Sequence, residues 1–423
     1  MNRRRWSRSR MAVTAVGAVA ALALTGCAAG GSAGGEGGDG EVTLKYAIWD
    51  EAQKPALEKI IDAFEGENPN VTVDLQLIPS TEYWTKIQTS VASGSGPDVF
   101  WINGPNFQLY ASNGQIAPID DQDIDPADYP KSLIDLYSFD GKLYGAPKDL
   151  DTIGVWYNKA LFDAAGLEYP KAGWTWDDFN AAAAALTDPA NGVWGTAAAP
   201  YGQMTYYNTI YQAGGEVISP DGTTSGFGTP EALEGVEFWT DLIASGSSPT
   251  AQQMTDTSPF DMWFSGKIGM FWDGSWAGGG NAASDLGDSI GVAPLPIGAA
   301  GNQSIVHGLA NVANAKSQHL AEAKAFAVFA SGEEGANIMA ETGTVIPAFN
   351  GTQQLWLDAL PQYDLQIFID ALENGVPYPI SKNTTAWNKF ENDILAQVWA
   401  GTVTPEDGLA ELDAKMQAEL DSE

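Results

Sequence analysis

Apolar residues follow two different spacings in the first third of the chain, and together they predict strands alternating with helices. Residues 42–49 and 71–78 are rich in β-forming residues, and 71–78 alternates polar with apolar positions. A third apolar stretch, 98–102, follows a Gly-Ser-Gly-Pro turn. Two stretches with helical spacing separate these strands. The first carries Leu57, Ile60, Ile61 and Phe64 on one face, and the second carries Tyr83, Trp84, Ile87 and Val91. Ser80 is the expected N-cap of the second helix. The order strand, helix, strand, helix, strand predicts parallel α/β construction.

Helix-start signals recur in the rest of the chain. Thr175 with Asp178 is a capping-box pattern in which Asp replaces Glu. Thr229 and Thr404 each precede a Pro at the first helical position. The last helix carries an apolar stripe, Leu409, Leu412, Met416 and Leu420, which we expect to pack in a core.

The N-terminus has the pattern of an export signal. A leader with five Arg precedes the uncharged stretch 11–24, which is too short to span a bilayer and typical of a signal peptide. The run Leu-Thr-Gly-Cys ending at Cys27 resembles the lipobox of bacterial lipoproteins. That resemblance implies a signal peptide at 1–26, acylation of Cys27 and anchoring to the outer face of the bacterial cell membrane. The alternative is an ordinary signal peptide with an incidental cysteine.

Composition limits what the protein can bind. Residues 27–40, Cys27 followed by a Gly-rich run, are expected to form a flexible tether to a body held together by apolar burial. The formal net charge is −34, so nucleic acid and anionic membranes are repelled and membrane residence depends on the lipid alone. One Cys and two His argue against a Cys/His zinc site, and no cofactor is expected.

Seven segments in order resemble the family 1 extracellular solute-binding proteins of ABC importers, the maltose-binding-protein-like group. They lie at 83–99, 140–147, 157–167, 174–179, 212–215, 264–270 and 343–348. The resemblance implies a two-lobe periplasmic-binding-protein-like α/β fold (type II, Venus flytrap) with hinge crossovers. Lobe 1 is expected at 41–151 plus 312–356, and lobe 2 at 152–311 plus 357–423. A ligand would lie between the lobes, which close on it.

The candidate ligand residues follow from the chemistry of a sugar. Aromatic rings cover its flat C–H faces, and carboxylates and amides bind its hydroxyls. Such residues stand at expected strand ends, where α/β sheets place ligand groups, and near the expected crossovers. The candidates are Trp49, Asp50, Asn103, Asp149, Asp151, Tyr206, Tyr207, Asp273, Ser275, Trp276 and His307.

These candidates rest on different grounds. Gly274-Ser275-Trp276 resembles the family's Gly-x-Trp loop, which implies that Trp276 stacks on a sugar ring. The family also often presents a stacking aromatic near Tyr206 and Tyr207. Simpler roles stay open, since Asp50 can be a helix cap and His307 can be structural.

We therefore expect a monomeric sugar receptor that delivers a sugar, an oligosaccharide by preference, to the permease subunits of an ABC importer. It is not expected to be an enzyme. The alternatives are the same receptor class for another solute such as a polyol, or a tethered glycoside hydrolase, which needs two carboxylates roughly 5–10 Å apart.

Overall fold

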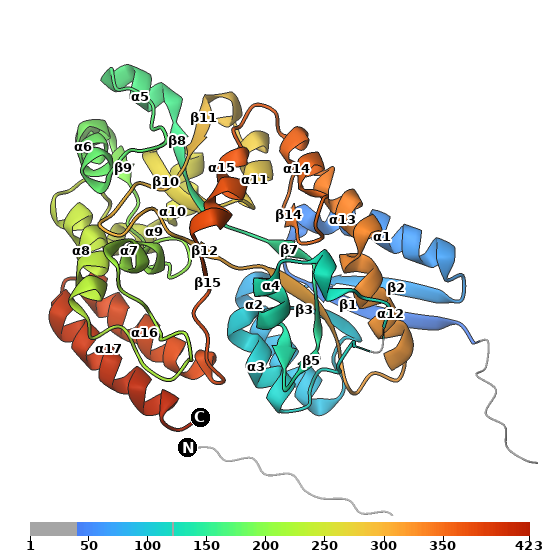
Figure 1. Ribbon diagram of the computed structural model, residues 1–423. Helices are drawn as coiled ribbons and strands as arrows, with labels where there is room; N and C mark the ends of the chain where they lie inside the picture. The colour runs from blue at the N-terminus through green and yellow to red at the C-terminus, as the bar shows by residue number, and fades with distance from the viewer. Residues whose placement is uncertain (1–39, 121) are drawn as a thin grey trace, which may run out of the picture. The chain divides into compact units, whose positions relative to one another are not determined.

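The computed structural model describes residues 40–120 and 122–423, so the predicted signal peptide, Cys27 and nearly all of the predicted tether lie outside the described residues. Residues 41–423 form one compact unit. Within it, two sheets with their own helices make two lobes (Figure 1). Among the described residues, no helix is both long enough and apolar enough to cross a bilayer.

Lobe 1 is built on a five-stranded sheet in the order β2-β1-β3-β13-β6. Strand β1 pairs in parallel with β2 and β3, which confirms the predicted strand–helix alternation of the first third. Strand β13 returns from much later in the chain and runs antiparallel to β3 and β6. The elements are β1 (Val42–Ile48), α1 (Lys54–Glu67), β2 (Val71–Leu77), α2 (Ser80–Ser93), β3 (Val99–Asn103), α3 (Gly104–Ser112), α4 (Lys131–Leu136), β6 (Gly145–Pro147), β13 (Leu309–Ala313), α12 (Leu320–Ser331), α13 (Glu333–Ala340) and α14 (Gln353–Ala359).

Lobe 2 is built on a four-stranded mixed sheet in the order β11-β8-β10-β9. Strand β8 is antiparallel to both β10 and β11, and β9 is parallel to β10. The elements are β8 (Ile153–Asn158), α5 (Lys159–Ala165), α6 (Trp176–Leu186), β9 (Trp194–Thr196), α7 (Tyr206–Ala213), α8 (Pro230–Ala244), α9 (Ala251–Asp256), α10 (Pro259–Phe264), β10 (Ile268–Gly274), α11 (Ala277–Ala283), β11 (Ile290–Ala293), α15 (Gln366–Asp370), α16 (Thr384–Trp399) and α17 (Pro405–Leu420).

Three short strand pairs and five short 3-10 helices complete the described secondary structure. The strand pairs are β4 (Ser138–Phe139) with β5 (Lys142–Leu143), β7 (Asp149–Leu150) with β14 (Ile346–Pro347), and β12 (Ser304–Val306) with β15 (Gly375–Pro377). The 3-10 helices are η1 (Glu51–Gln53), η2 (Pro126–Asp128), η3 (Pro189–Asn191), η4 (Gly287–Ser289) and η5 (Ala371–Asn374).

Local sequence signals account for most of these boundaries. Thr175 and Asp178 form the predicted capping box of α6, and Thr229 and Thr404 cap α8 and α17 through their side chains. The predicted apolar stripe of α17 is buried. One cap prediction was wrong: Pro79 occupies the N-cap of α2, and Ser80 is already helical.

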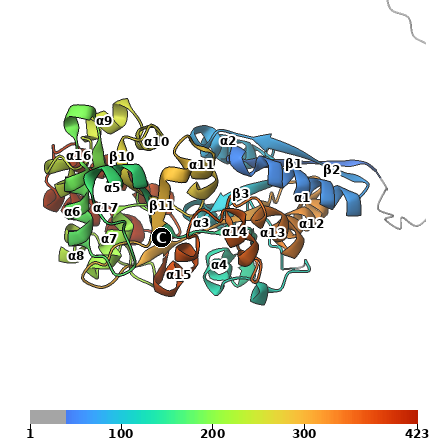
Figure 2. The ribbon, with the colours of Figure 1, turned by 90° about the horizontal axis from the view of Figure 1, so that it is seen from above.

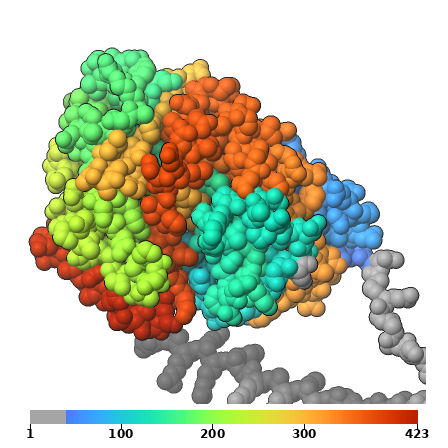
Figure 3. All heavy atoms as spheres, in the orientation of Figure 1, coloured from blue at the N-terminus to red at the C-terminus, as the bar shows by residue number. Residues whose placement is uncertain are grey.

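The chain crosses between the lobes three times. Leu309 already pairs with Asn103 in the lobe 1 sheet, so β13 starts three residues before the expected position 312. Helix α14 packs on α13 and β14, whereas α15 packs on β8 of lobe 2. The third crossing therefore follows the end of α14 at Ala359. The stretch around residues 360–380 lies along the junction on the face shown in Figure 3.

The first two crossings run side by side. Asp151 and His307 form an isolated antiparallel bridge, in which Asp151 N donates to His307 O at 2.9 Å and His307 N donates to Asp151 O at 3.2 Å. Helix α11 lies at the boundary of the two lobes (Figure 2), and a methyl group on its Gly278 would meet Leu360 Cδ1 at 3.0 Å. The junction is thus formed by bonded crossover strands and a closely packed helix.

Candidate functional site

A pocket of about 240 Å³ lies at the crossovers and is lined from both lobes. Eight of the eleven predicted ligand residues line it: Trp49, Asp50, Asn103, Asp149, Asp151, Ser275, Trp276 and His307. Gln53, Leu150, Gln203, Leu309 and Val345 complete the wall. The pocket therefore combines indole rings with carboxylate and amide groups.

Lobe 1 contributes the residues that follow β1 and β3. Trp49 comes directly after β1 and packs edge to face on Tyr83 and Trp101, at centroid distances of 4.8 and 5.0 Å. Asp50 caps the short helix η1, with Oδ1 accepting from Ala52 N at 2.9 Å. Both roles that the sequence left open for Asp50 are compatible, because the capping residue also lines the pocket.

Asn103 ends β3 and starts α3. Its Oδ1 accepts from Asn106 N at 3.3 Å and from Asn106 Nδ2 at 2.8 Å, so the N-cap fixes the side chain. Next to it, Gly104 N donates to His307 Nε2 at 3.1 Å. Burial lowers the pKa of His307 to about 3, so the imidazole is neutral and its Nε2 is available as this acceptor.

The first crossover places two carboxylates at the floor of the pocket. Asp149 is buried and is held by Lys148 and by Leu309 N, which donates to its Oδ1 at 2.6 Å. Gln203 Nε2 donates to Asp151 Oδ1 at 2.5 Å. Burial, followed by the nearby charge of Asp149, raises the pKa of Asp151 well above its usual value. A ligand hydroxyl at this point can therefore meet a protonated carboxyl as donor or an ionised one as acceptor.

Lobe 2 contributes the loop after β10. Ser275 is fully buried, its N donates to Thr152 O at 3.0 Å, and its Oγ has no hydrogen-bond partner. Trp276 is partly buried, and its six-membered ring lies against Gly274, where a Cβ would come within 2.1 Å of Trp276 Cζ3. Glycine at 274 lets the ring lie here, and a side chain at this position would displace it.

Asp273 stands behind this loop and does not line the pocket. It is buried, its Oδ1 accepts from Gly274 N at 2.7 Å, and it also receives a side-chain hydrogen bond from Trp276. Burial raises the pKa of Asp273 to about 7 against the opposing effect of those two bonds. Asp273 is therefore placed to hold the indole of Trp276 in position through this hydrogen bond.

Tyr206 and Tyr207 also lie away from the pocket. Both are buried on α7, and Tyr207 Oη donates to Glu391 Oε2 at 2.9 Å. Glu391 is itself buried on α16, and burial raises its pKa to about 7. The two tyrosines therefore serve the packing of α7 against α16, and Tyr378, 5.6 Å from Tyr207, is the aromatic that reaches the interlobe surface.

A second, more open hollow of about 550 Å³ shares Asn103 with the pocket. Lobe 1 supplies Trp84, Pro105 and Asn106, and lobe 2 supplies Tyr378 and α16. The lining from α16 is polar: Thr385, Asn388, Lys389, Asn392 and Asp393. The interlobe surface thus extends well beyond the space of one sugar ring.

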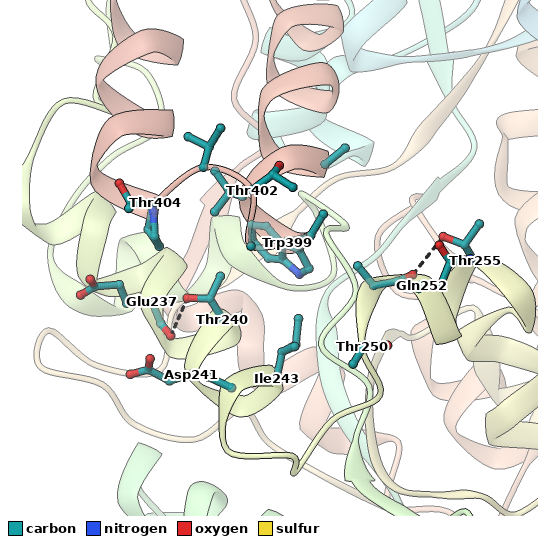
Figure 4. A pocket seen from close by; sticks show the side chains of 18 residues that line it. Glu237, Thr240, Asp241, Ile243, Thr250, Gln252, Thr255, Trp399, Thr402 and Thr404 are labelled. Atoms are coloured by element: carbon teal, nitrogen blue, oxygen red, sulfur yellow. Dashed lines mark hydrogen bonds between the residues drawn. The ribbon is translucent and has the colours of Figure 1, made fainter.

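A larger cavity, of about 820 Å³, lies elsewhere. It is an open groove between α8, α9 and the turn from α16 to α17, all in lobe 2 (Figure 4). Its threonine hydroxyls include Thr240, which donates to Glu237 O, and Thr255, which donates to Ala251 O. A groove within one lobe, with hydroxyls bonded to their own helices, cannot join the two lobes around a ligand.

Sequence reasoning missed two polar residues of the pocket. Gln53 lies three residues after Asp50, and its Nε2 donates to Asp50 Oδ2 at 2.9 Å. Because side chains at this spacing are neighbours on a helix, the sequence could have indicated that Gln53 lies beside Asp50. Gln203 meets Asp151 only through the tertiary fold. Among the described residues, no group of three or more His, Cys, Asp or Glu is arranged to hold a metal ion.

Comparison with known proteins places this geometry in a family. The model of the bacterial extracellular solute-binding protein family matches residues 49–337. A solved structure, the ABC substrate-binding protein Lmo0181 from Listeria monocytogenes in complex with cycloalternan, superposes with a TM-score of 0.85 and 29% identity, covering 90% of this chain and 99% of that one.

Curated relatives match over shorter stretches. A binding protein of Brucella abortus is 28% identical over 237 residues, which is 55% of this chain and 57% of the relative. The maltotriose-binding protein of Pyrococcus abyssi is 28% identical over 264 residues, 60% of this chain and 53% of the relative. The chain thus spans little more than half the length of these curated relatives.

The family match and the structural superposition confirm the resemblance and the two-lobe α/β fold predicted from the sequence. With its pocket lined from both lobes and a family match over residues 49–337, this chain belongs to the bacterial extracellular solute-binding protein family.

Proposed function

We propose that this protein is the sugar-binding component of an ABC importer, which captures an oligosaccharide outside the cytoplasm and delivers it to membrane permease subunits. The observation that carries the proposal is the pocket itself, in which Trp49 and Trp276 come from opposite lobes and the same wall includes Asp50, Asp149 and Asp151. Rings bury the apolar faces of a sugar, and carboxylates bind its hydroxyls.

Ser275 supports a hydroxyl-bearing ligand. Its buried Oγ has no partner within the described protein, and a buried polar atom left alone costs free energy. A sugar hydroxyl can provide the missing hydrogen bond. The adjoining polar hollow along α16 supports a ligand of several rings.

Lobe closure needs no covalent chemistry. A ligand that touches both lobes stabilises the closed state, and a shift from 1:99 to 99:1 closed needs about 5.5 kcal/mol of differential affinity. Hydrogen bonds to charged groups contribute about 1.5–3 kcal/mol each, so a few carboxylate contacts suffice. The protein acts as a monomeric receptor and not as an enzyme.

The ligands of similar proteins indicate which compounds to test first. The Listeria protein was solved with cycloalternan, and the Pyrococcus protein is a maltotriose-binding protein. A thermal-shift screen should therefore include cycloalternan, maltotriose and arabino-oligosaccharides, with D-mannitol to represent polyols. A ligand at 100 times its dissociation constant raises the free energy of unfolding by about 2.7 kcal/mol.

The screen also tests the alternatives. If D-mannitol is the only compound that stabilises the protein, the ligand is a polyol and not a sugar. If oligosaccharides are shortened after incubation with the protein, the protein is a hydrolase. If no sugar or polyol stabilises the protein, the proposal of a sugar receptor fails.

The same proposal places the protein outside the cytoplasm, held by an acylated Cys27. Replacing Cys27 by Ser should move the protein from the membrane fraction to the medium or periplasm. A Cys27→Ser protein that stays with the membrane would contradict the lipid anchor and leave the sugar site untouched.

A further inference from the structure

Lys148 is a buried cation beside the pocket, in a chain whose formal net charge is −34. Its side chain is only 3% exposed, and it is absent from the pocket wall. A buried ammonium persists only where other groups replace its lost water. Lys148 has three such partners: the carboxylate of Asp149, Gln53 Oε1 at 2.9 Å, and the ring of Trp101 with its centroid 4.3 Å from Nζ.

Each partner leads to a side chain that faces the pocket. Asp149 lines the pocket itself. Gln53 connects Lys148 to Asp50, because its Oε1 accepts from Lys148 Nζ and its Nε2 donates to Asp50 Oδ2 at 2.9 Å. Trp101 packs edge to face on Trp49 at 5.0 Å. Lys148 thus contacts one pocket carboxylate, Asp149, directly, and reaches a second carboxylate, Asp50, and the indole of Trp49 through one intervening side chain each.

The arrangement also includes both of the paired crossovers. Lys148 N donates to Leu309 O at 2.8 Å, and Leu309 N donates to Asp149 Oδ1 at 2.6 Å. Since Lys148 binds Oδ2 of the same carboxylate, both oxygens of Asp149 are held and the group cannot rotate. The second crossover is fixed to the first at the point where the ligand would sit.

We propose that Lys148 is a positioning residue of the ligand site, which holds Asp149, Asp50 and Trp49 in their binding arrangement without touching the sugar. This inference rests on the proposed function, because the three groups are ligand groups only if the pocket binds a solute. A buried ion pair that served folding alone would change the free energy of unfolding and leave the affinity of the folded protein unchanged.

The test replaces the ammonium while keeping the aliphatic stem. Lys148→Met should weaken binding of cycloalternan or maltotriose by about tenfold or more, because removing one partner of a buried charge pair leaves the other uncompensated. Lys148→Arg should recover most of the lost affinity, since it keeps the charge and the donors. Calorimetry on the folded full chain measures both.

A matched control removes a lysine from an exposed ion pair. Lys131 pairs with Asp135 one helical turn away, with 86% of its side chain exposed. Lys131→Met changes the net charge by the same amount, so its sugar affinity should equal that of the wild type. An equal loss in both Met variants would assign the effect to net charge and overturn the inference.

A second readout needs no ligand. Amide hydrogen exchange at residues 49–53 and at Leu309 should become faster in Lys148→Met, because Asp149 loses its ammonium partner and Gln53, whose Nε2 donates to Asp50, loses its own hydrogen bond to Lys148. If Lys148→Met fails to fold, Lys148→Met with Asp149→Asn leaves no unpaired buried charge and should show the same faster exchange at 49–53.

The outcomes separate the two proposals. Wild-type affinity together with unchanged exchange at 49–53 in the lysine variants would overturn the positioning role. If neither sugar binds the wild type, the proposed function fails for these sugars, and the exchange measurement still decides whether Lys148 orders the pocket.

Discussion

Gly274→Ala offers a direct test of Trp276, because the substitution acts on the ring without touching the ligand. An ideal Cβ at position 274 would lie 2.1 Å from Trp276 Cζ3 and 2.3 Å from Cη2. Ordinary contact begins at 3.4 Å, so the ring must move by at least about 1.3 Å. Gly274 has no positive φ, so alanine fits the backbone and the strain falls on the indole.

The loss of affinity can be worked from the area of the ring. A buried aromatic side chain removes 150–250 Å² from water, and a sugar on one face covers roughly 100 Å² of it. At about 25 cal/mol per Å², that contact contributes roughly 2.5 kcal/mol. Displacing the ring should therefore weaken sugar binding by between about tenfold and a hundredfold, measured by isothermal titration calorimetry.

Gly279→Ala is the matched control on the neighbouring helix α11. Its Cβ would meet only Thr344 Cγ2, at an ordinary 3.8 Å, and alanine favours the helix. This variant should bind sugar as the wild type does. The reasoning is refuted if folded Gly274→Ala binds within twofold of the wild type, or if Gly279→Ala loses as much affinity.

Four further predictions address single side chains. Trp276→Ala should weaken sugar binding at least about tenfold with the unfolding temperature near that of the wild type, and unchanged affinity by calorimetry would remove Trp276 from the site. Ser275→Ala should leave the unfolding temperature equal or higher, because Ser275 Oγ has no hydrogen-bond partner among the described residues, and lower the affinity by about two- to tenfold, because a sugar hydroxyl is its proposed partner; a lower unfolding temperature with full affinity would contradict this. Tyr207→Phe should keep the affinity within about twofold and lower the unfolding temperature, since Glu391 loses a hydrogen bond; a large loss of affinity would return Tyr207 to the ligand site. Because burial raises the pKa of Asp273 and of Glu391 to about 7, folding takes up protons between the ordinary carboxyl pKa and 7, and the free energy of unfolding should fall as pH rises through that window; denaturant titrations of Asp273→Asn should show a smaller fall, and an unchanged pH slope would contradict the raised pKa.

The sequence could predict the pocket residues that stand at the end of a strand. Trp49 follows β1 and Asn103 is the last residue of β3; the two strands are parallel neighbours in the sheet, so both residues lie at the same edge. The Gly-x-Trp resemblance likewise indicated Trp276, which lines the pocket. In these cases the local pattern and the order of the strands determine where a side chain lies.

Other residues depend on tertiary contacts that no local pattern contains. Tyr206 and Tyr207 lie on a helix that is buried nearly all round, so helical spacing could not tell which face meets α16 and Glu391. Gln203 reaches Asp151 across 52 residues of sequence. The register of β13 likewise depends on tertiary contacts, because it is set by pairing with β3 and β6.

The bridge between Asp151 and His307 has a mechanical consequence. Two peptide segments that are hydrogen-bonded to each other bend as one ribbon, so neither can swing independently when the lobes rotate. Both residues also belong to the cavity wall. In the proposed closure, the segments that bend and the wall that meets the ligand therefore share the same main chain, so a ligand that contacts Asp151 would act directly on the segments that bend.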